Sequence, residues 1–274
     1  MSIASELISL TTAICQQHLL PAVSWLHLPS ENPRDPHHKK FGVLALADGS
    51  CGFFFTRLGD NLKQLRDKID EKQILRTPVL DIAEGYDNDN LVKRSLGLGA
   101  LNAIAQHVFS HSTNVLQNEV DPLGQLNLDS SNQVGMVGFF KPLVQMLKDQ
   151  HVPVTVFEKD ESYRDYDGPV DVTLDAGALH RCDRVLITAS TLLNGSLDSV
   201  LANCAADARV ALIGPTVGCF PDPFFARGID VVGGSRVTDL FGLKKHMELG
   251  ENWGNSVTKY CIARQEYTGA RCLF

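Results

Sequence analysis

The first third of the chain combines helical and strand-like hydrophobic patterns. Apolar residues recur at steps of three and four within 3–14 and again within 58–69, which predicts two helices that each bury one face. The dipeptide Asp48-Gly49, between two apolar runs, is typical of a tight hairpin. The apolar runs that predict strands lie at 22–28, 41–48 and 49–56.

Residues 91–108 predict a further helix that contains the small-residue stretch SLGLGALNAIAQ. Glycine within a helix costs stability, so packing must compensate for it. We expect the small side chains to let another stretch of backbone approach closely. The pattern of this third of the chain is therefore that of an α+β unit.

The pattern changes after a polar stretch at 109–132, where periodicity is lost. We place a domain boundary there, which divides the chain into 1–112 and 113–274. The second part alternates apolar strands with helices, and its strands are continuous apolar runs. That alternation predicts a doubly wound, mainly parallel sheet of Rossmann type. The predicted strands are 133–140, 152–158, 183–190, 208–216 and 229–234.

Composition narrows the class of protein. The chain has 274 residues, with 25 Lys+Arg against 32 Asp+Glu and a net charge of −7. This balance argues against a general nucleic-acid binder, which carries a basic face. The 44% of hydrophobic residues is too high for disorder, and no run is long enough to span a membrane. An odd count of 7 cysteines without a C-x-x-C pair favours reduced thiols, so we expect a soluble cytoplasmic protein.

Ligands of an open parallel sheet bind beyond the carboxyl ends of its strands, so these ends are where we look for a site. Gly135 and Gly138 lie at the first of them, but the stretch lacks the full G-x-G-x-x-G pattern. Phe139 and Phe140 would hinder the approach of a pyrophosphate. Glu158 follows the second strand, about where an acid that binds a ribose is expected, although it also suits a simple strand end.

The next strand is followed by a run of hydroxyl and amide side chains. Thr188, Ser190, Thr191 and Asn194 lie between this strand and a helix, where backbone amides favour an anion. Capping of the helix by Asn194 or Ser196 is the structural alternative.

Two later strand ends add further candidates. Gly214, Pro215 and Thr216 follow the strand at 208–216 and form a turn at the same edge. Arg236 follows a Gly-Gly pair and could present its guanidinium to an anion, or could pair with Asp239 three residues later on a helix. For Cys219 and Asp222, by contrast, we expect structural roles. Cys219 is predicted to be a buried thiol and Asp222 the N-cap of a helix.

Pairs of metal-binding side chains are present but incomplete. His107 and His111 are four residues apart, Cys15 and His18 are three apart, and His37 lies beside His38. None has a second pair at a recognised spacing, so we expect no preformed zinc site.

Three blocks of the sequence look like those of a known family. QVGMVGFFKPLV, VLITASTLLNGSLDSVL and ALIGPTVGCFPDPFFARGIDVVGGSRVTD resemble the hallmark blocks of the putative heavy-metal chelation family, formerly a domain of unknown function. SLGLGALNAI resembles a block of its smaller domain. The resemblance implies an enolase N-terminal-like α+β domain followed by a Rossmann-like α/β domain, with a site in the cleft between them. The chain departs from some relatives at Gly218-Cys219-Phe220, which is less polar.

The residues and the resemblance together support one hypothesis for function. We expect the cleft to bind, and to process if the protein is an enzyme, a small anionic or metal-chelating ligand. Glu158 and Asp239 are the candidate acid, base or metal-facing groups. Residues 84–86 and Asn102 are candidates to close the cleft. The candidate ligand-binding residues are Gly135, Gly138, Thr188, Ser190, Thr191, Asn194, Gly214, Pro215, Thr216 and Arg236.

The identity of the ligand stays open at this point. A divalent or heavy metal ion is the cofactor that the resemblance suggests, and its ligands are unknown. The alternatives are an enzyme that uses NAD(P) or S-adenosylmethionine and a carrier of a metal chelate without catalysis. We expect a small-molecule partner, no nucleic acid and no membrane, and a homodimer on base rates alone.

Overall fold

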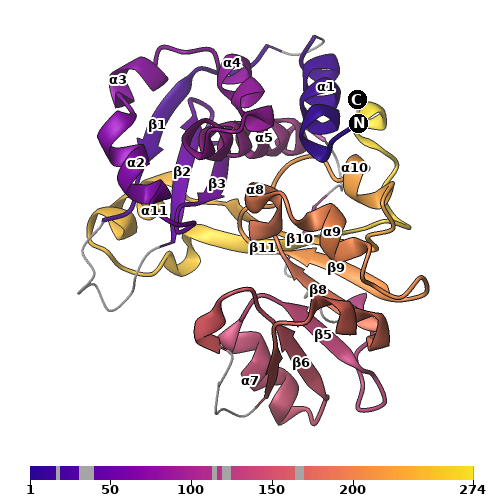
Figure 1. Ribbon diagram of the computed structural model, residues 1–274. Helices are drawn as coiled ribbons and strands as arrows, with labels where there is room; N and C mark the ends of the chain where they lie inside the picture. The colour runs from indigo at the N-terminus through magenta and orange to yellow at the C-terminus, as the bar shows by residue number, and fades with distance from the viewer. Residues whose placement is uncertain (17–18, 31–39, 113–115, 119–124, 164–169, 274) are drawn as a thin grey trace.

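The computed structural model describes residues 1–16, 19–30, 40–112, 116–118, 125–163 and 170–273 and has a mixed α/β architecture with two sheets (Figure 1). The smaller sheet is antiparallel, in the order β1 (Val23–His27), β2 (Phe41–Leu46), β3 (Cys51–Phe55). The predicted hairpin at Asp48-Gly49 is confirmed, because Gly49 has a φ of +91° and its amide donates to the Leu46 carbonyl at 3.1 Å.

Among the described residues, five helices accompany this sheet, and side-chain caps begin three of them, α1, α3 and α5. Ser2 accepts the amide of Ser5 at 3.1 Å at the start of the first helix, and Asn90 accepts the amide of Val92 at 3.0 Å at the start of the last. The helices predicted over 3–14, 58–69 and 91–108 are therefore present. The five are α1 (Ile3–Cys15), α2 (Asn61–Lys68), α3 (Glu71–Ile74), α4 (Val79–Glu84) and α5 (Leu91–Ser110).

The larger sheet has eight strands. Their order is β4 (Gln117–Asn118), β11 (Val257–Ala263), β10 (Val231–Val237), β9 (Arg209–Ile213), β8 (Arg184–Thr188), β5 (Val134–Val137), β6 (Val154–Phe157), β7 (Asp171–Thr173). All pairs from β10 to β7 are parallel, whereas β11 and β4 are antiparallel. The chain builds outward from β5 to β7 and then from β8 to β10, so the strand order reverses between β5 and β8. This is the topological switch point of a doubly wound sheet.

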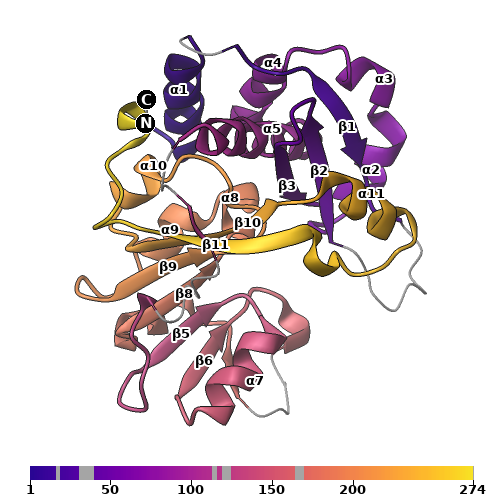
Figure 2. The same cartoon turned by 180° about the vertical axis from the view of Figure 1, so that it is seen from behind.

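The helices of this part lie on both faces of the sheet. Helices α8 (Ser190–Asn194) and α9 (Leu197–Leu201) cover one face and α7 (Lys141–Asp149) covers the opposite one, as Figures 1 and 2 show. Along the chain, α10 (Asp222–Phe225) precedes β10 and α11 (Leu240–Glu248) follows it.

The sequence predicts five strands of this sheet and misses three, β4, β7 and β11. β4 has only two residues. β7 has only three residues, and β11 (VTKYCIA) mixes polar and apolar positions without clean alternation. The predicted helical pairing of Arg236 with Asp239 is wrong. Arg236 lies within β10, and Asp239 is the N-cap of α11, where its Oδ1 accepts the amide of Gly242 at 3.0 Å.

Helix α5 is the element on which both sheets pack. Every residue from Ser95 to Phe109 is buried, so this helix has no polar face. The expected close approach occurs at β3, where a Cβ on Gly52 would lie 1.9 Å from the Gly99 carbonyl oxygen and 2.6 Å from the Ala103 nitrogen. One continuous apolar core includes Leu44 of the small sheet, Leu101 of α5 and Leu212 of β9.

Asn102 of α5 joins the two sheets by hydrogen bonds. This side chain is 1% exposed. Its Nδ2 donates to the carbonyls of Phe53 in β3 at 2.8 Å and of Thr216 after β9 at 2.9 Å, and its Oδ1 accepts the Gly218 amide at 3.0 Å. One turn later, Nε2 of Gln106 donates to the Gly218 carbonyl at 3.1 Å. Helix α5 therefore supplies three hydrogen bonds to Thr216 and Gly218 in the loop after β9.

We predict that Gly52→Ala destabilises the protein by about 3 kcal/mol, because the added methyl group meets helix backbone that has no room to move. Gly59→Ala is the control, because Gly59 has open space around it and a φ of +49°. This variant should lose only about 1 kcal/mol of stability, through backbone strain alone. Urea unfolding of both variants measures the difference. Equal losses would show that the contact between β3 and α5 can relax.

We predict that Asn102→Ala lowers the free energy of unfolding by about 3 kcal/mol, because three buried backbone groups each lose a partner worth about 1 kcal/mol. The matched control is Asn203→Ala, whose Nδ2 donates to the Ser199 carbonyl in an exposed setting. That variant should change stability by less than about 1 kcal/mol. A loss for Asn102→Ala no larger than for Asn203→Ala would contradict this account.

Candidate functional site

The carboxyl ends of the central strands are partly covered by α5 and its neighbours. Asn102 contacts the loop after β9, as described, and the hydroxyl of Tyr86 donates to the Leu192 carbonyl in α8 at 2.9 Å. Tyr86 and Asn102 were both expected to close a cleft between the two parts of the chain. Both make contact across this junction, and two recesses beside it adjoin predicted site residues.

The larger of these, here called the carboxyl-edge recess, has a volume of about 310 Å³. It opens at the ends of β5 and β9, on the face that α7 covers. Gly233 pairs with Ile213, the last residue of β9, so β10 extends beyond the end of β9 from Gly234 onward. Residues 233–235 form one side of the recess. Its lining residues are Phe140, Pro142, Leu143, Ile213, Gly214, Pro215, Gly233, Gly234, Ser235, Trp253, Gly254, Val257 and Lys259.

The small sheet fixes one wall of the carboxyl-edge recess. The ring of Trp253 stacks on Phe53 of β3, with 4.7 Å between ring centroids and 26° between planes, and meets Phe41 edge-on at 5.6 Å. An indole held by two aromatic rings keeps its orientation when a ligand enters. The recess is thus formed by the large sheet on one side and by a residue positioned by the small sheet on another.

The polar groups of this recess are few and favour an anion. Lys259 is exposed and lies opposite Ser235 in the β10–β11 pairing, so the ammonium and the hydroxyl belong to one face. Helix α7 begins at the rim with Lys141, directly after Phe140, and no side chain caps its first turn. Pro142 has no N–H, and the amides of Leu143 and Val144 donate to the Phe140 carbonyl at 2.9 and 3.0 Å. What this end of α7 offers an anion is the positive end of the helix dipole. An apolar molecule with one anionic group therefore matches this lining.

A smaller recess of about 100 Å³, here called the Arg94 recess, lies between α1, α5 and the α8–α9 turn. The Arg94 guanidinium carbon is 5.9 Å from the centroid of the Tyr86 ring, and its Nε is buried without a hydrogen-bond partner among the described residues. Thr191 and Asp198 also line this recess, and Asp198 pairs with Arg227 at 2.9 Å. Its volume suits a single small group rather than a whole organic ligand.

The loop after β5 is closed by Glu158. One oxygen of this carboxylate accepts the amide of Phe139 at 2.7 Å, and the other accepts the amide of Lys159 at 3.2 Å. Gly138 has a φ of +90°, and a Cβ there would lie 2.9 Å from Cγ2 of Thr188. A dinucleotide pyrophosphate would have to displace the carboxylate from the Phe139 amide, so this loop does not match a dinucleotide-binding turn.

The hydroxyl and amide residues after β8 bond mainly to one another. Thr191 donates to the Thr188 carbonyl at 2.7 Å, and Thr188 donates to the Ser190 hydroxyl at 3.2 Å. Asn194 accepts both the amide and the hydroxyl of Ser196, at 3.0 and 2.6 Å. The capping alternative is wrong: Asn194 ends α8 and closes the turn to Ser196, and Ser196 is the N-cap of α9 but makes no side-chain capping bond. Thr191 adjoins the Arg94 recess, so this group does not share a recess with Gly214 and Pro215.

The remaining predicted residues are spread over the fold. Gly135 is in the middle of β5, where a Cβ would lie 2.9 Å from Sγ of Cys182, so packing requires glycine there. Thr216 is 1% exposed. Arg236 follows Ser235 in β10 and so faces the opposite side of the sheet from the recess. Asp239 is the cap of α11. Binding roles for these residues stay predictions.

Trp253 and Lys259 are the recess residues that the sequence did not single out. The strand that carries Lys259 was not predicted, and Trp253 lies in the loop before it. The signal that the sequence offers is a tryptophan beside Gly254-Asn255, which alone does not point to a wall of a binding site.

The described side chains do not form a site for a metal ion held by three protein ligands. Within the ranges given above, no group of three or more His, Cys, Asp or Glu residues has suitable geometry. Cys219 is fully buried, and burial raises the pKa of its thiol to about 12, so it is not a thiolate. His18, His37 and His38 lie outside the described residues. In the same part of the chain, no helix is long and apolar enough to cross a membrane.

Comparison with known proteins places this fold in a family. A family model named DUF364 and described as "Putative heavy-metal chelation" matches residues 121–263. An uncharacterized protein of Methanocaldococcus jannaschii is 31% identical over 162 residues, which are 59% of this chain and 60% of that protein. The match thus spans less than two thirds of that relative.

Two solved structures share the fold across almost the whole chain. A DUF364 protein of unknown function from Pyrococcus horikoshii superposes with a TM-score of 0.71 at 19% identity, covering 95% of this chain and 99% of that one. Another from Desulfitobacterium hafniense DCB-2 gives a TM-score of 0.65 at 20% identity, covering 94% and 98%. At these identities the likeness concerns the fold alone. Because the family model matches more than half of its residues, this chain belongs to the DUF364 family.

Proposed function

We propose that this protein binds a small organic anion that itself chelates a metal ion, and that it does so in the carboxyl-edge recess. The observation that carries the proposal is the recess of about 310 Å³ at the strand ends, with an apolar lining and a lysine at its rim. Ligand sites of α/β proteins occur at this edge, and small-molecule pockets have volumes from about 300 Å³ upward.

The lining supports an organic ligand with an apolar body. Phe140, Leu143 and Trp253 offer ring and methyl contacts, and Gly214 with a φ of +140° lets the ligand approach the backbone. The ammonium of Lys259 and the start of α7 supply attraction for one negative group. A bare metal ion finds no carboxylate, imidazole or thiol in this lining.

A chelate reconciles the family description with these side chains. The description concerns heavy-metal chelation, yet the described residues offer no set of three protein donors. A ligand that brings its own oxygen or nitrogen donors removes that requirement, because the protein then recognises the organic part. A carrier of such a chelate and an enzyme acting on it both fit this proposal.

A nucleotide cofactor is the alternative that the Rossmann-like sheet raises. The bond from the Phe139 amide to Glu158 disfavours it, because that amide faces the phosphates in dinucleotide-binding folds. NAD⁺ and S-adenosylmethionine are therefore included as competing ligands in the experiment.

The test uses the fluorescence of Trp253 in a Trp25→Phe background, since the chain has only these two tryptophans. Pyridine-2,6-dicarboxylate, alone and with equimolar Zn²⁺, is the probe. We expect saturable quenching, with NAD⁺ and S-adenosylmethionine giving none. Saturable binding of either nucleotide, with no response to the dicarboxylate, would favour the alternative and contradict the proposal.

Two variants locate the binding. Both variants are titrated by calorimetry, because Leu143→Trp adds a tryptophan of its own. Leu143→Trp fills the recess and should abolish binding, and Lys259→Met should weaken binding about tenfold, because a charge-assisted contact is lost. Lys148→Met is the matched control on the exposed last turn of α7 and should bind as the parent does. Unchanged affinity in Leu143→Trp would show that the probe binds elsewhere.

A further inference from the structure

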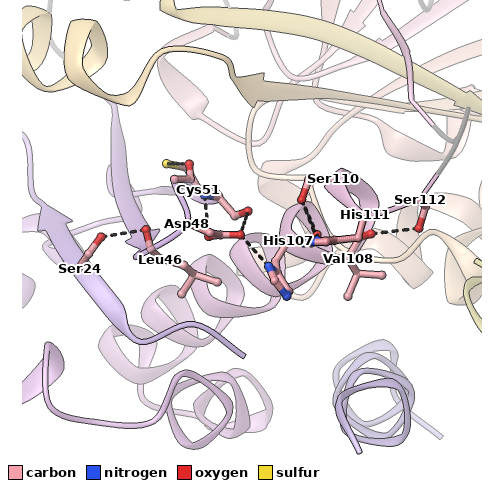
Figure 3. A network of polar contacts seen from close by, with 11 residues as sticks. Ser24, Leu46, Asp48, Cys51, His107, Val108, Ser110, His111 and Ser112 are labelled. Atoms are coloured by element: carbon pink, nitrogen blue, oxygen red, sulfur yellow. Dashed lines mark hydrogen bonds and ion pairs between the residues drawn. The ribbon is translucent and has the colours of Figure 1, made fainter. Parts of the chain in front are cut away.

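The C-terminal end of α5 carries two histidines in a network that the proposed function does not use (Figure 3). Nδ1 of His107 lies 2.6 Å from Oδ2 of Asp48, which is in the hairpin between β2 and β3. Nδ1 of His111 lies 2.8 Å from the carbonyl oxygen of His107. The two imidazole rings are neighbours, with 4.6 Å between their centroids and 60° between their planes.

The oxygen partners determine which ring nitrogen is left for another ligand. A neutral imidazole whose Nδ1–H donates to a carboxylate or carbonyl has its lone pair on Nε2. No hydrogen bond joins either Nε2 to another described residue. The side chain of His107 is 11% exposed, so part of the imidazole reaches the surface. His111 is exposed.

Asp48 is held as a carboxylate that orients His107. Burial acts against its charged form, but hydrogen bonds from His107 and from the amide and hydroxyl of Ser50 outweigh burial and lower the pKa of Asp48. The two contacts with Ser50 are 3.1 and 2.9 Å. The carboxylate therefore has three donors, and its position does not depend on a metal.

We propose that His107 and His111 together bind a divalent late first-row ion, such as Zn²⁺, Cu²⁺ or Ni²⁺, through their Nε2 atoms. Histidines four residues apart lie on one face of a helix, and imidazole is the protein ligand that these ions share. In metal-bound histidines, the ring nitrogen that does not bind the metal usually donates a hydrogen bond to a carboxylate, a carbonyl or water. Water molecules complete the coordination, because two protein ligands leave open positions.

The nearby thiol does not take part. Cys51 donates its S–H to the Gly49 carbonyl at 3.2 Å, and burial raises its pKa to about 12. Without thiolate, the site is a pair of neutral nitrogens, which selects borderline ions over soft ones and binds them with modest affinity. The site lies in the hairpin and helix of the N-terminal part, so it is independent of the carboxyl-edge recess.

Calorimetric titration with Zn²⁺ alone tests the proposal on the full chain. His111 is exposed, so His111→Ala should fold normally and should weaken the strongest site at least tenfold. His246→Ala is the matched control. Nδ1 of His246 also forms a hydrogen bond with a carboxylate, that of Glu251 at 2.9 Å, but α11 contains no second histidine. It should bind as the parent does.

A second measurement identifies the ligands directly. The electron paramagnetic resonance spectrum of the Cu²⁺-loaded protein should show two coordinated nitrogens, and only one in His111→Ala. Asp48→Asn removes the orienting charge and should weaken Zn²⁺ binding about tenfold. Equal Zn²⁺ affinity in the parent and His111→Ala, or an unchanged nitrogen count, would overturn the proposal. Loss of binding in Leu143→Trp, which blocks only the recess, would also contradict it.

Discussion

The burial of α5 on all sides is the constraint on which the rest of this structure depends. A helix without a polar face is stable only when protein surrounds it, and here the small sheet, α1 and α4 lie on some sides and the loops after β8 and β9 on another. Its glycines and alanines bring β3 within backbone contact. Its two buried amide side chains, Asn102 and Gln106, donate to the neighbouring backbone, which offsets part of the cost of burying them.

This constraint decides where a ligand can bind. The carboxyl edge of a doubly wound sheet is normally open, but here α5 forms hydrogen bonds with Thr216 and Gly218 in the loop after β9. The space that remains is displaced toward the α7 face. There Trp253, stacked on Phe53, links the shape of the recess to the position of the small sheet. The two sheets thus act together on one site although they share no strand.

The predicted site residues fall into two groups: some line the recess, and others form hydrogen bonds with amides nearby in the sequence. The strand ends are visible in the sequence, and Gly214 and Pro215 do line the recess. Asn194 and Asp239 have the same residue types as binding groups, yet each bonds to an amide two or three residues away. A single sequence does not distinguish a cap from a binding group, because both need an oxygen acceptor beside an exposed amide.

By itself, the sequence determined the strands from β5 to β10 except β7, the hairpin at Asp48-Gly49 and the close packing of α5, because these follow from local periodicity and from glycine. It also placed His107 and His111 four residues apart, on one helix face if the helix extends that far, and the structure ends α5 at Ser110 with His111 as its C-cap. Only the tertiary structure decided that Glu158 closes the loop after β5, that Asp48 orients His107, and that Trp253 forms a wall of the recess. Each of these contacts joins residues 19 or more positions apart, and such pairings depend on how the elements pack rather than on any spacing along the chain.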